Sequence, residues 1–351
     1  MHSIRNWFII GIIDPERRHP PTNPAKIPPH STEKEETRHY YNLILTQLRR
    51  QGHDPALQKG VFNMLTKEQL QQKFSEGIRI LDGATGSNLR NAGMPKGCCA
   101  EAWILENPEP LVALQRAYAE AGSQIIYAPT FQAQPIALKA QGLDSHTEKI
   151  NEALVALSRS AAPDCLIAGD LTTLATFCDS WDEASFDLLV ENYRRQIRGL
   201  IEGGADLLVG ETLLYAQEAE AILCAAELEG AGAQMYTFTM QGDGSLFSGA
   251  PAGPILRSLE EAGAAAVGFN CVAADMMLPY LVSKLRRQVK GPLICKPNAG
   301  VPTIGADGIA VYSQTPEEFA AIVKQCRDNG ASILGGCCGT APAYLSALSQ
   351  L

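Results

Sequence analysis

The sequence predicts an α/β fold in which eight strand–helix units form a barrel of the (β/α)8, or TIM, type. Three observations lead to this prediction. From residue 64 onward, short and almost continuously apolar runs alternate with longer amphipathic runs. The short runs have the length of buried parallel strands, and the longer runs have the length of helices that cover a sheet. Eight such units follow one another before the chain ends, which suits the size of a (β/α)8 barrel.

Each predicted strand is a run rich in β-branched and other apolar residues. In chain order the strands are predicted at 78–83, 123–131, 165–171, 205–212, 234–240, 265–271, 292–300 and 331–338. Between them, apolar residues recur three and four positions apart, which is the period of an amphipathic helix. These helices are predicted at 108–122, 147–162, 185–204, 216–230, 254–263, 275–289, 315–330 and 341–351. A doubly wound open sheet is the alternative, but DGATGSNL (82–89) lacks the G-x-G-x-x-G pattern of its phosphate loop.

Residues 1–63 differ from the rest of the chain. Segment 19–39 is rich in proline and charge and has too few apolar residues to form a core. We therefore expect a poorly ordered N-terminal extension of unknown role at 1–63, followed by a single barrel domain at 64–351. Alternatively, the extension is translated sequence upstream of a natural start at Met64.

Charge and hydropathy argue against two classes of partner. The formal net charge of −9 disfavours a nucleic-acid or anionic-membrane surface. No apolar run reaches the roughly 18 residues that a membrane span needs. The apolar run at 7–13 is short and has no small-residue cleavage site after it, unlike a signal peptide. We expect no nucleic-acid partner, no membrane association and a cytoplasmic location.

The carboxyl ends of the strands should form the active site, because this is where barrel enzymes place it. A polar residue or cysteine stands at each predicted strand end. In chain order these residues are Asp82, Thr130, Asp170, Glu211 with Thr212, Thr239, Asn270 with Cys271, Asn298, and Cys337 with Cys338. A single polar residue at a strand end is more often a cap than a functional group. Thr130 and Asp170 are therefore weaker candidates for lining the substrate pocket.

Three of the ten cysteines converge on this rim. Cys271 ends the sixth strand, and the adjacent pair Cys337 and Cys338 ends the eighth, within GGCCGT (335–340). The pair admits three interpretations: a strained vicinal disulfide, two inert core residues, or two ligands of one metal. Neighbouring strand residues point to opposite faces, but the flanking glycines give the backbone freedom to turn both thiols one way. Three thiolates with an open fourth position would make a catalytic site for Zn²⁺, with copper(I) or an iron–sulfur centre less favoured.

Four motifs, in this order, resemble the homocysteine-binding barrel of the homocysteine S-methyltransferase family: DGATGSNL, GFNC, KPNAG and GGCCGT. The resemblance covers roughly residues 76–351. Within the family, the pairing of KPNAG with GGCCGT is most similar to the barrel of cobalamin-dependent methionine synthase. The resemblance implies a zinc-dependent enzyme that methylates the thiol of homocysteine, or of a related compound, to form methionine.

The resemblance also implies roles for individual residues. Cys271, Cys337 and Cys338 match the zinc ligands of the family, which form its catalytic centre. Asp82 and Glu211 match acidic residues that hold the amino group of the substrate. Asn298, in KPNAG, matches a position near the metal. A second pair of adjacent cysteines, at 98–99, has no assigned role.

The chemistry of a bound thiol explains why such a site needs no general base. An alkyl thiol has a pKa of about 8.5 and is a poor nucleophile at neutral pH, whereas binding to Zn²⁺ removes its proton. This suits a main body in which His146 is the one histidine after residue 53. The preferred methyl donor is a methylated corrinoid protein, because the motifs favour methionine synthase. The cobalamin motif D-x-H-x-x-G is itself absent, so methylcobalamin would be carried by a partner protein.

Two other hypotheses remain open at this point. The same reaction with S-methylmethionine or betaine as donor is the first of them. A non-catalytic zinc-binding or thiol-binding barrel subunit is the second, and metal content together with turnover would separate it from an enzyme.

Overall fold

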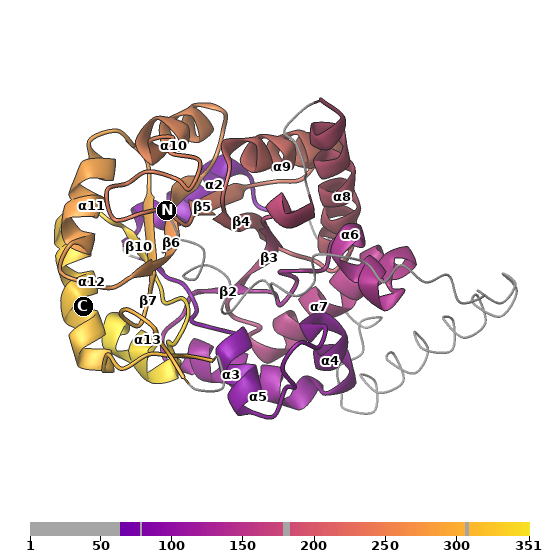
Figure 1. Ribbon diagram of the computed structural model, residues 1–351, viewed down its shortest axis with the longest axis horizontal. Helices are drawn as coiled ribbons and strands as arrows, with labels where there is room; N and C mark the ends of the chain where they lie inside the picture. The colour runs from indigo at the N-terminus through magenta and orange to yellow at the C-terminus, as the bar shows by residue number, and fades with distance from the viewer. Residues whose placement is uncertain (1–63, 78, 178–182, 306–308) are drawn as a thin grey trace, which may run out of the picture.

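The computed structural model describes residues 64–77, 79–177, 183–305 and 309–351, so the predicted extension at 1–63 and Cys178 lie outside the described residues. Its main sheet has eight parallel strands in the order β1-β10-β7-β6-β5-β4-β3-β2. The strands are β1 (Arg79–Ile80), β2 (Ile125–Tyr127), β3 (Leu166–Thr172), β4 (Leu207–Leu213), β5 (Gln234–Phe238), β6 (Ala266–Ala273), β7 (Leu293–Asn298) and β10 (Ile333–Leu334). A parallel bridge between Leu81 and Ile125 joins the two edges of the sheet, next to β1 and β2. The predicted α/β class with a parallel sheet is confirmed, and the arrangement resembles a TIM barrel (Figure 1).

A helix of eight to twenty residues follows each strand of this sheet and lies outside it (Figure 1). These helices are α5 (Pro108–Glu120), α7 (Thr147–Ala161), α8 (Glu183–Glu202), α9 (Ala216–Glu229), α10 (Ala252–Glu261), α11 (Leu278–Arg286), α12 (Pro316–Asp328) and α13 (Pro342–Ser349). Local sequence explains where α12 begins. Thr315 accepts from the backbone N–H of Glu318 at 3.3 Å, and Glu318 accepts from the N–H of Thr315 at 2.9 Å. This capping box satisfies backbone donors that the first helical turn leaves free, and Pro316 suits the first helical position.

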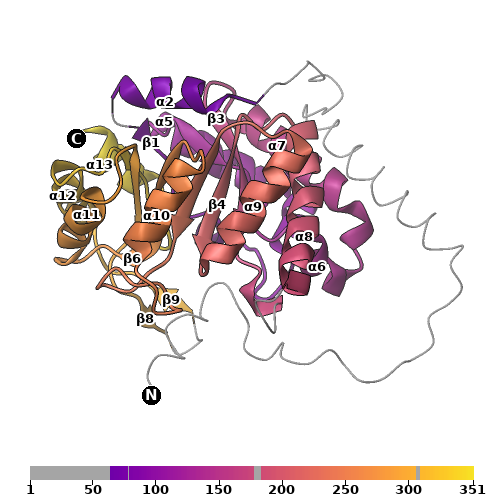
Figure 2. The same ribbon diagram turned by 90° about the horizontal axis from the view of Figure 1, so that it is seen from above.

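Several shorter elements were not predicted. They are α2 (Lys67–Ser75), α3 (Gly86–Asn91), α4 (Ala100–Glu106), α6 (Pro135–Leu138), the 3-10 turns η3 (Lys139–Gln141), η4 (Asp144–His146) and η5 (Ala175–Phe177), and the antiparallel pair β8 (Thr303–Ile304) and β9 (Ala310–Val311). Figure 2 shows α2 at one end of the sheet and the β8–β9 pair at the opposite end.

Helix α2 closes the amino end of the sheet. The N–H of Leu65 donates to the carbonyl of Asp206 at 2.8 Å, and the carbonyl of Leu65 accepts from Ala233 at 2.6 Å. These contacts place the start of α2 beside the first residues of β4 and β5. Leu70 and Phe74 of α2 are buried in the same cluster as the inward-facing strand residues. Their apolar surface is thus removed from water, which favours folding by about 25 cal/mol per Å² buried.

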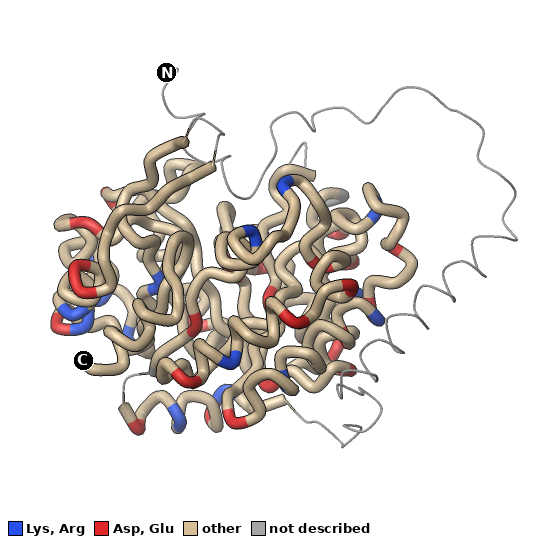
Figure 3. Tube along the Cα trace, turned by 90° about the horizontal axis from the view of Figure 1, so that it is seen from below, with Lys and Arg blue, Asp and Glu red and all other residues tan. Residues whose placement is uncertain are grey.

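The remaining apolar residues form a larger core between the sheet and the outer helices. Lys and Arg are interspersed with Asp and Glu along the outer helices in the view of Figure 3. Among the described residues, no helix combines the length and apolarity needed to cross a membrane. The carboxyl-terminal ends of the strands, opposite α2, carry the polar residues singled out from the sequence.

Candidate metal and substrate site

The three cysteines predicted to converge do lie together. Cys271 is in the last part of β6, and Cys337 and Cys338 follow β10. Their three sulfur atoms all lie within 4.8 Å of one another, and the Sγ atoms of Cys271 and Cys338 are 3.8 Å apart. Two sulfurs bound tetrahedrally to one Zn²⁺ at about 2.3 Å would be separated by about 3.8 Å. The donor atoms and their spacing therefore fit a zinc ion.

Backbone geometry at both strand ends turns these thiols together. Cys271 has a left-handed φ of 57°, and the pairing of β6 with β7 shifts register between Asn270 and Ala273. After the adjacent pair, Gly339 has a φ of 81° and faces the ring of Tyr312, where a side chain would clash. The two glycines before the pair were expected to turn the backbone, but neither adopts a left-handed φ. Their lack of a side chain instead allows neighbouring atoms to approach closely.

The electrostatics of the cysteine cluster also favour a cation. Hydrogen bonds from Cys271 and Cys337 hold the pKa of Cys338 well below its usual range. The pKa of Cys271 is raised well above its usual value, first by its hydrogen bond with Cys337 and then by that with Cys338. One sulfur of the trio therefore ionises readily, while further ionisation meets a neighbouring negative charge. A divalent cation would remove this obstacle, because metal binding deprotonates coordinating thiols.

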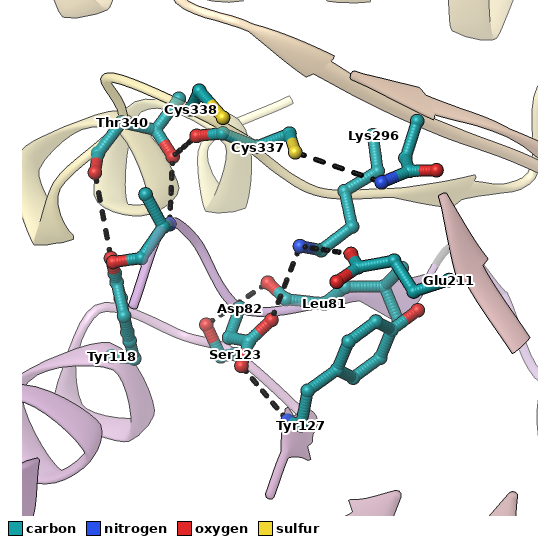
Figure 4. Close-up of polar contacts among 12 residues, drawn as sticks. Leu81, Asp82, Tyr118, Ser123, Tyr127, Glu211, Lys296, Cys337, Cys338 and Thr340 are labelled. Carbon is teal, nitrogen blue, oxygen red and sulfur yellow. Dashed lines mark hydrogen bonds and ion pairs between the residues drawn. The ribbon is translucent and has the colours of Figure 1, made fainter. Parts of the chain in front are cut away.

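Beside the cysteines lies a buried acidic cluster that contains a lysine. The ammonium of Lys296 is 2.9 Å from Glu211 Oε1 and 3.7 Å from Asp82 Oδ1 (Figure 4). It also lies 4.8 Å from the ring centroid of Tyr127, within the range of a cation–π interaction. Burial alone would lower the pKa of Lys296, but the surrounding negative groups, with Glu211 and Asp82 the largest contributors, together raise it well above its usual value. Lys296 is therefore a charged internal partner of both predicted substrate-binding acids.

The acidic cluster holds more carboxyl groups than cations. Asp170, at 4% exposure, is the third buried carboxyl near Lys296. Burial raises the pKa of both Asp170 and Glu211. One oxygen of Asp82 and one of Asp170 have no hydrogen-bond partner among the described residues. The cluster thus retains acceptor capacity for a second cationic group.

Asp82 should make the stability of the metal-free protein fall as pH rises. Burial raises the pKa of this carboxyl from 3.8 to about 7, in spite of Lys296. The folded state holds the proton more tightly than the unfolded chain, so the stabilisation is complete below pH 3.8 and is lost as pH rises through about 7. Asp82→Asn should flatten this part of the profile, which urea unfolding at about pH 5 and about pH 8 would measure.

An exposed carboxyl provides the control for this measurement. Asp164→Asn changes a surface residue that precedes β3, and it should leave the pH profile of stability like that of the parent. If Asp82→Asn and the parent protein show equally steep profiles, the assignment of this proton to Asp82 is wrong.

Two motifs quoted from the sequence meet at this site. The backbone N–H of Gly336 donates to the carbonyl of Asp82 at 3.1 Å, and that of Ala84 donates to Thr340 Oγ1 at 3.2 Å. Tyr118 reinforces this junction, because its hydroxyl donates to the carbonyl of Ala84 at 2.7 Å. The loop after β1 and the loop after β10 are therefore held side by side, with Asp82 close to the cysteine cluster.

The two remaining predicted residues, Thr130 and Asn298, differ in what they contact. The side-chain oxygen of Asn298 accepts from the N–H of Cys338 at 3.0 Å, so this residue lies directly beside the cysteines, as expected from the sequence. Thr130 is fully buried, and its hydroxyl donates to the carbonyl of Asp170 at 2.9 Å and accepts from the same residue's N–H at 3.0 Å. Thr130 thus fastens the end of β2 to β3 and keeps Asp170 in place.

Sequence reasoning missed two residues of this site, Lys296 and Tyr312. Lys296 carried a detectable signal: it alternates with Ile294 and Asn298 along β7 and therefore shares their inward face. Tyr312 carried none, because it lies beyond the strand ends, next to β9. Its hydroxyl forms a hydrogen bond with Cys338 that contributes to the lowered pKa of that thiol.

Comparisons with known proteins relate the chain to one family. The family model described as homocysteine S-methyltransferase matches residues 79–351. Methionine synthase of Mycobacterium tuberculosis is 26% identical over 291 residues, and that of Mycobacterium leprae is 24% identical over 295 residues. These alignments cover 78% and 79% of this chain but 24% of each relative, so the chain spans about a quarter of their length.

Solved structures give the same fold. The metallated form of the homocysteine methyltransferase MmuM from Escherichia coli matches with a TM-score of 0.69 and 24% identity, covering 80% of this chain and 99% of that chain. The oxidized form of the same protein matches with a TM-score of 0.66 and 25% identity, covering 78% of this chain and 95% of that chain.

Proposed function

The chain belongs to the homocysteine S-methyltransferase family, and we propose that it transfers a methyl group to the thiol of homocysteine to form methionine. The observation that carries the proposal is the cluster of three sulfurs within 4.8 Å at the carboxyl end of the sheet. Cys271, Cys337 and Cys338 would hold Zn²⁺ through these sulfurs. When bound, the metal supplies the acidity that keeps an incoming thiol deprotonated at neutral pH.

The charge of the cysteine cluster suits this chemistry. Three thiolates outweigh the charge of one divalent ion, so the cluster retains negative charge and does not further withdraw electrons from an incoming sulfur. Asn298 and Tyr312 hydrogen-bond with Cys338 and thereby fix one wall of the cluster. No side chain is needed as a general base, and among the described residues His146, in the turn η4, is the one histidine.

The acidic cluster would select the amino acid that carries the thiol. Homocysteine has an ammonium group a few bonds from its sulfur, and Asp82 contacts both the cysteine loop, through its backbone carbonyl, and Lys296, through its carboxylate. We assign Asp82 and Glu211 to the ammonium group, with Asp170 as a third acid. Lys296 neutralises part of this charge in advance, and a bound ammonium group would neutralise a further part of it.

A methylated corrinoid held by another protein, or by another part of a longer one, is the proposed methyl donor. Two considerations support it: the motifs favour the methionine synthase barrel, and relatives named methionine synthase are about four times longer than the matched region. S-methylmethionine and betaine are the alternatives. We further propose that residues 64–351 form one closed (β/α)8 domain, supported by the bridge between Leu81 and Ile125.

A screen of methyl donors tests the function directly. Zinc-loaded protein is incubated with homocysteine and, in separate reactions, methylcobalamin, S-methylmethionine, S-adenosylmethionine or betaine, and methionine is quantified by mass spectrometry. We expect methionine to form, most rapidly with methylcobalamin, and to disappear when a chelator removes the zinc. Zinc-loaded protein that binds homocysteine but forms no methionine with any donor would instead be a non-catalytic thiol-binding barrel.

A further inference from the structure

Asn270 makes contacts that reach two parts of the candidate site at once. Its side chain is fully buried, and it lies between the core of β6 and Cys271. Its amide nitrogen donates to Thr212 Oγ1 at 2.6 Å and to Cys337 Sγ at 3.7 Å. Its amide oxygen accepts from the N–H of Thr212 at 3.0 Å. One side chain therefore bonds both the end of β4 and a proposed metal ligand.

We propose that Asn270 is a positioning residue through which the turn at Thr212, next to Glu211, sets the orientation of the Cys337 sulfur toward the metal. This inference rests on the proposed function, because it takes the three cysteines as the metal ligands. It assigns a task to a residue that touches neither the substrate nor the metal.

The backbone is strained at Thr212, where this link begins, and at Cys271, the residue that follows Asn270. Thr212 and Cys271, with φ values of 58° and 57°, are the two residues other than glycine with positive φ in the described part of the chain. For a β-branched residue such as threonine this conformation is unfavourable and persists only where surrounding contacts enforce it. Asn270 supplies such contacts, because it engages both the N–H and the hydroxyl of Thr212.

The planar amide group explains how the two contacts depend on each other. The two N–H bonds of an amide point in fixed directions in one plane, so the contact with Thr212 determines where the second N–H points. That second N–H donates to Cys337 Sγ. A hydrogen bond to a ligand sulfur orients it and draws charge from it, and such outer contacts commonly set metal affinity by about 10-fold to 100-fold.

Cobalt(II) titrations of three variants test the proposal in the full-length protein. Co²⁺ replaces Zn²⁺ and reports on sulfur ligands through its sulfur-to-cobalt charge-transfer absorption. Asn270→Ala should bind Co²⁺ about 10-fold to 100-fold more weakly and shift this absorption. Thr212→Val keeps the shape of the side chain but removes the acceptor of one N–H, and it should give a smaller change in the same direction.

Asn151 provides a matched control. It is also fully buried, and its amide nitrogen also donates to two acceptors, the carbonyls of Ala133 at 2.9 Å and Thr147 at 2.8 Å. Asn151→Ala should lower stability without changing cobalt affinity or absorption. This comparison separates positioning of the sulfur from a general loss of buried hydrogen bonds.

The possible results have distinct meanings. Folded Asn270→Ala with the affinity and absorption of the parent would overturn the inference. If Asn270→Ala does not fold, Thr212→Val decides, because an unchanged cobalt site in that variant shows that no influence passes from Thr212 to the sulfur. A parent protein that binds neither Zn²⁺ nor Co²⁺ would instead contradict the proposed function.

Discussion

Protein carrying Cys337→Ser is expected to lose its zinc and, with it, methyl transfer to homocysteine. The serine hydroxyl is far less acidic than a thiol and binds zinc poorly, and the two remaining sulfurs leave the ion without a third protein ligand. Without the metal, most of the substrate thiol stays protonated at neutral pH. Metal content after dialysis against a weak chelator, measured by mass spectrometry, should fall from about one zinc per chain to a trace.

The other cysteines supply the comparison. Cys271→Ser and Cys338→Ser should behave like Cys337→Ser, because their sulfurs share one cluster. Cys98 is exposed and lies outside that cluster, so Cys98→Ser should retain both zinc and turnover. If zinc remains bound after Cys271→Ser and Cys337→Ser are combined, the ligands have been assigned wrongly.

Lys296→Met is expected to be the most destabilising single change at the acidic cluster. The side chain of Lys296 is 4% exposed and its ammonium faces Glu211 and Asp82, so its removal leaves buried carboxylates without a cation. Breaking a buried ion pair in this way typically costs about 3–5 kcal/mol of the free energy of unfolding. Urea unfolding of metal-free protein would measure the loss.

The loss in Lys296→Met should depend on pH in a defined direction. Burial raises the pKa values of Asp82 and Glu211, so at low pH both carboxyls take up protons and no charge is left uncompensated. The variant should therefore lie closer to the parent at about pH 5 than at about pH 8. Lys324 pairs with Asp328 on the surface at 2.9 Å, and Lys324→Met should change little at either pH. Equal stability of Lys296→Met and the parent at the higher pH would contradict the role given to Lys296.

The sequence predicted the strands better than the segments around them. Runs such as 205–212 are apolar along most of their length, and this pattern arises when a strand is covered on both faces. Helix α2 escaped prediction because its nine residues KEQLQQKFS contain two buried apolar residues, Leu70 and Phe74. Such a short helix shows little periodicity, and its stability comes from contacts with β4 and β5 that no local pattern contains.

Site residues could be predicted from the sequence where their chemistry is distinctive, as with the cysteine sulfurs. Residues that matter through their contacts with other residues were harder to predict. Cys271 and the pair at 337–338 stood out because three sulfurs at strand ends suit one kind of chemistry. Thr130 stood out for the same positional reason, yet its hydroxyl serves the backbone of Asp170. The ion pairs of Lys296 join residues that are 85 and 214 positions away in the chain, and only the folded sheet brings them together.

The position of helix α2 has a consequence for the order of events in turnover. Because α2 occupies the amino end of the sheet with Leu70 and Phe74, the proposed substrates, homocysteine and a methyl donor, would both enter from the carboxyl end. The acids are buried there, beside the sulfurs, so a bulky donor that docked first would bar the way to the smaller amino acid. Kinetics should accordingly be sequential and ordered, with homocysteine binding before the donor and methionine leaving last.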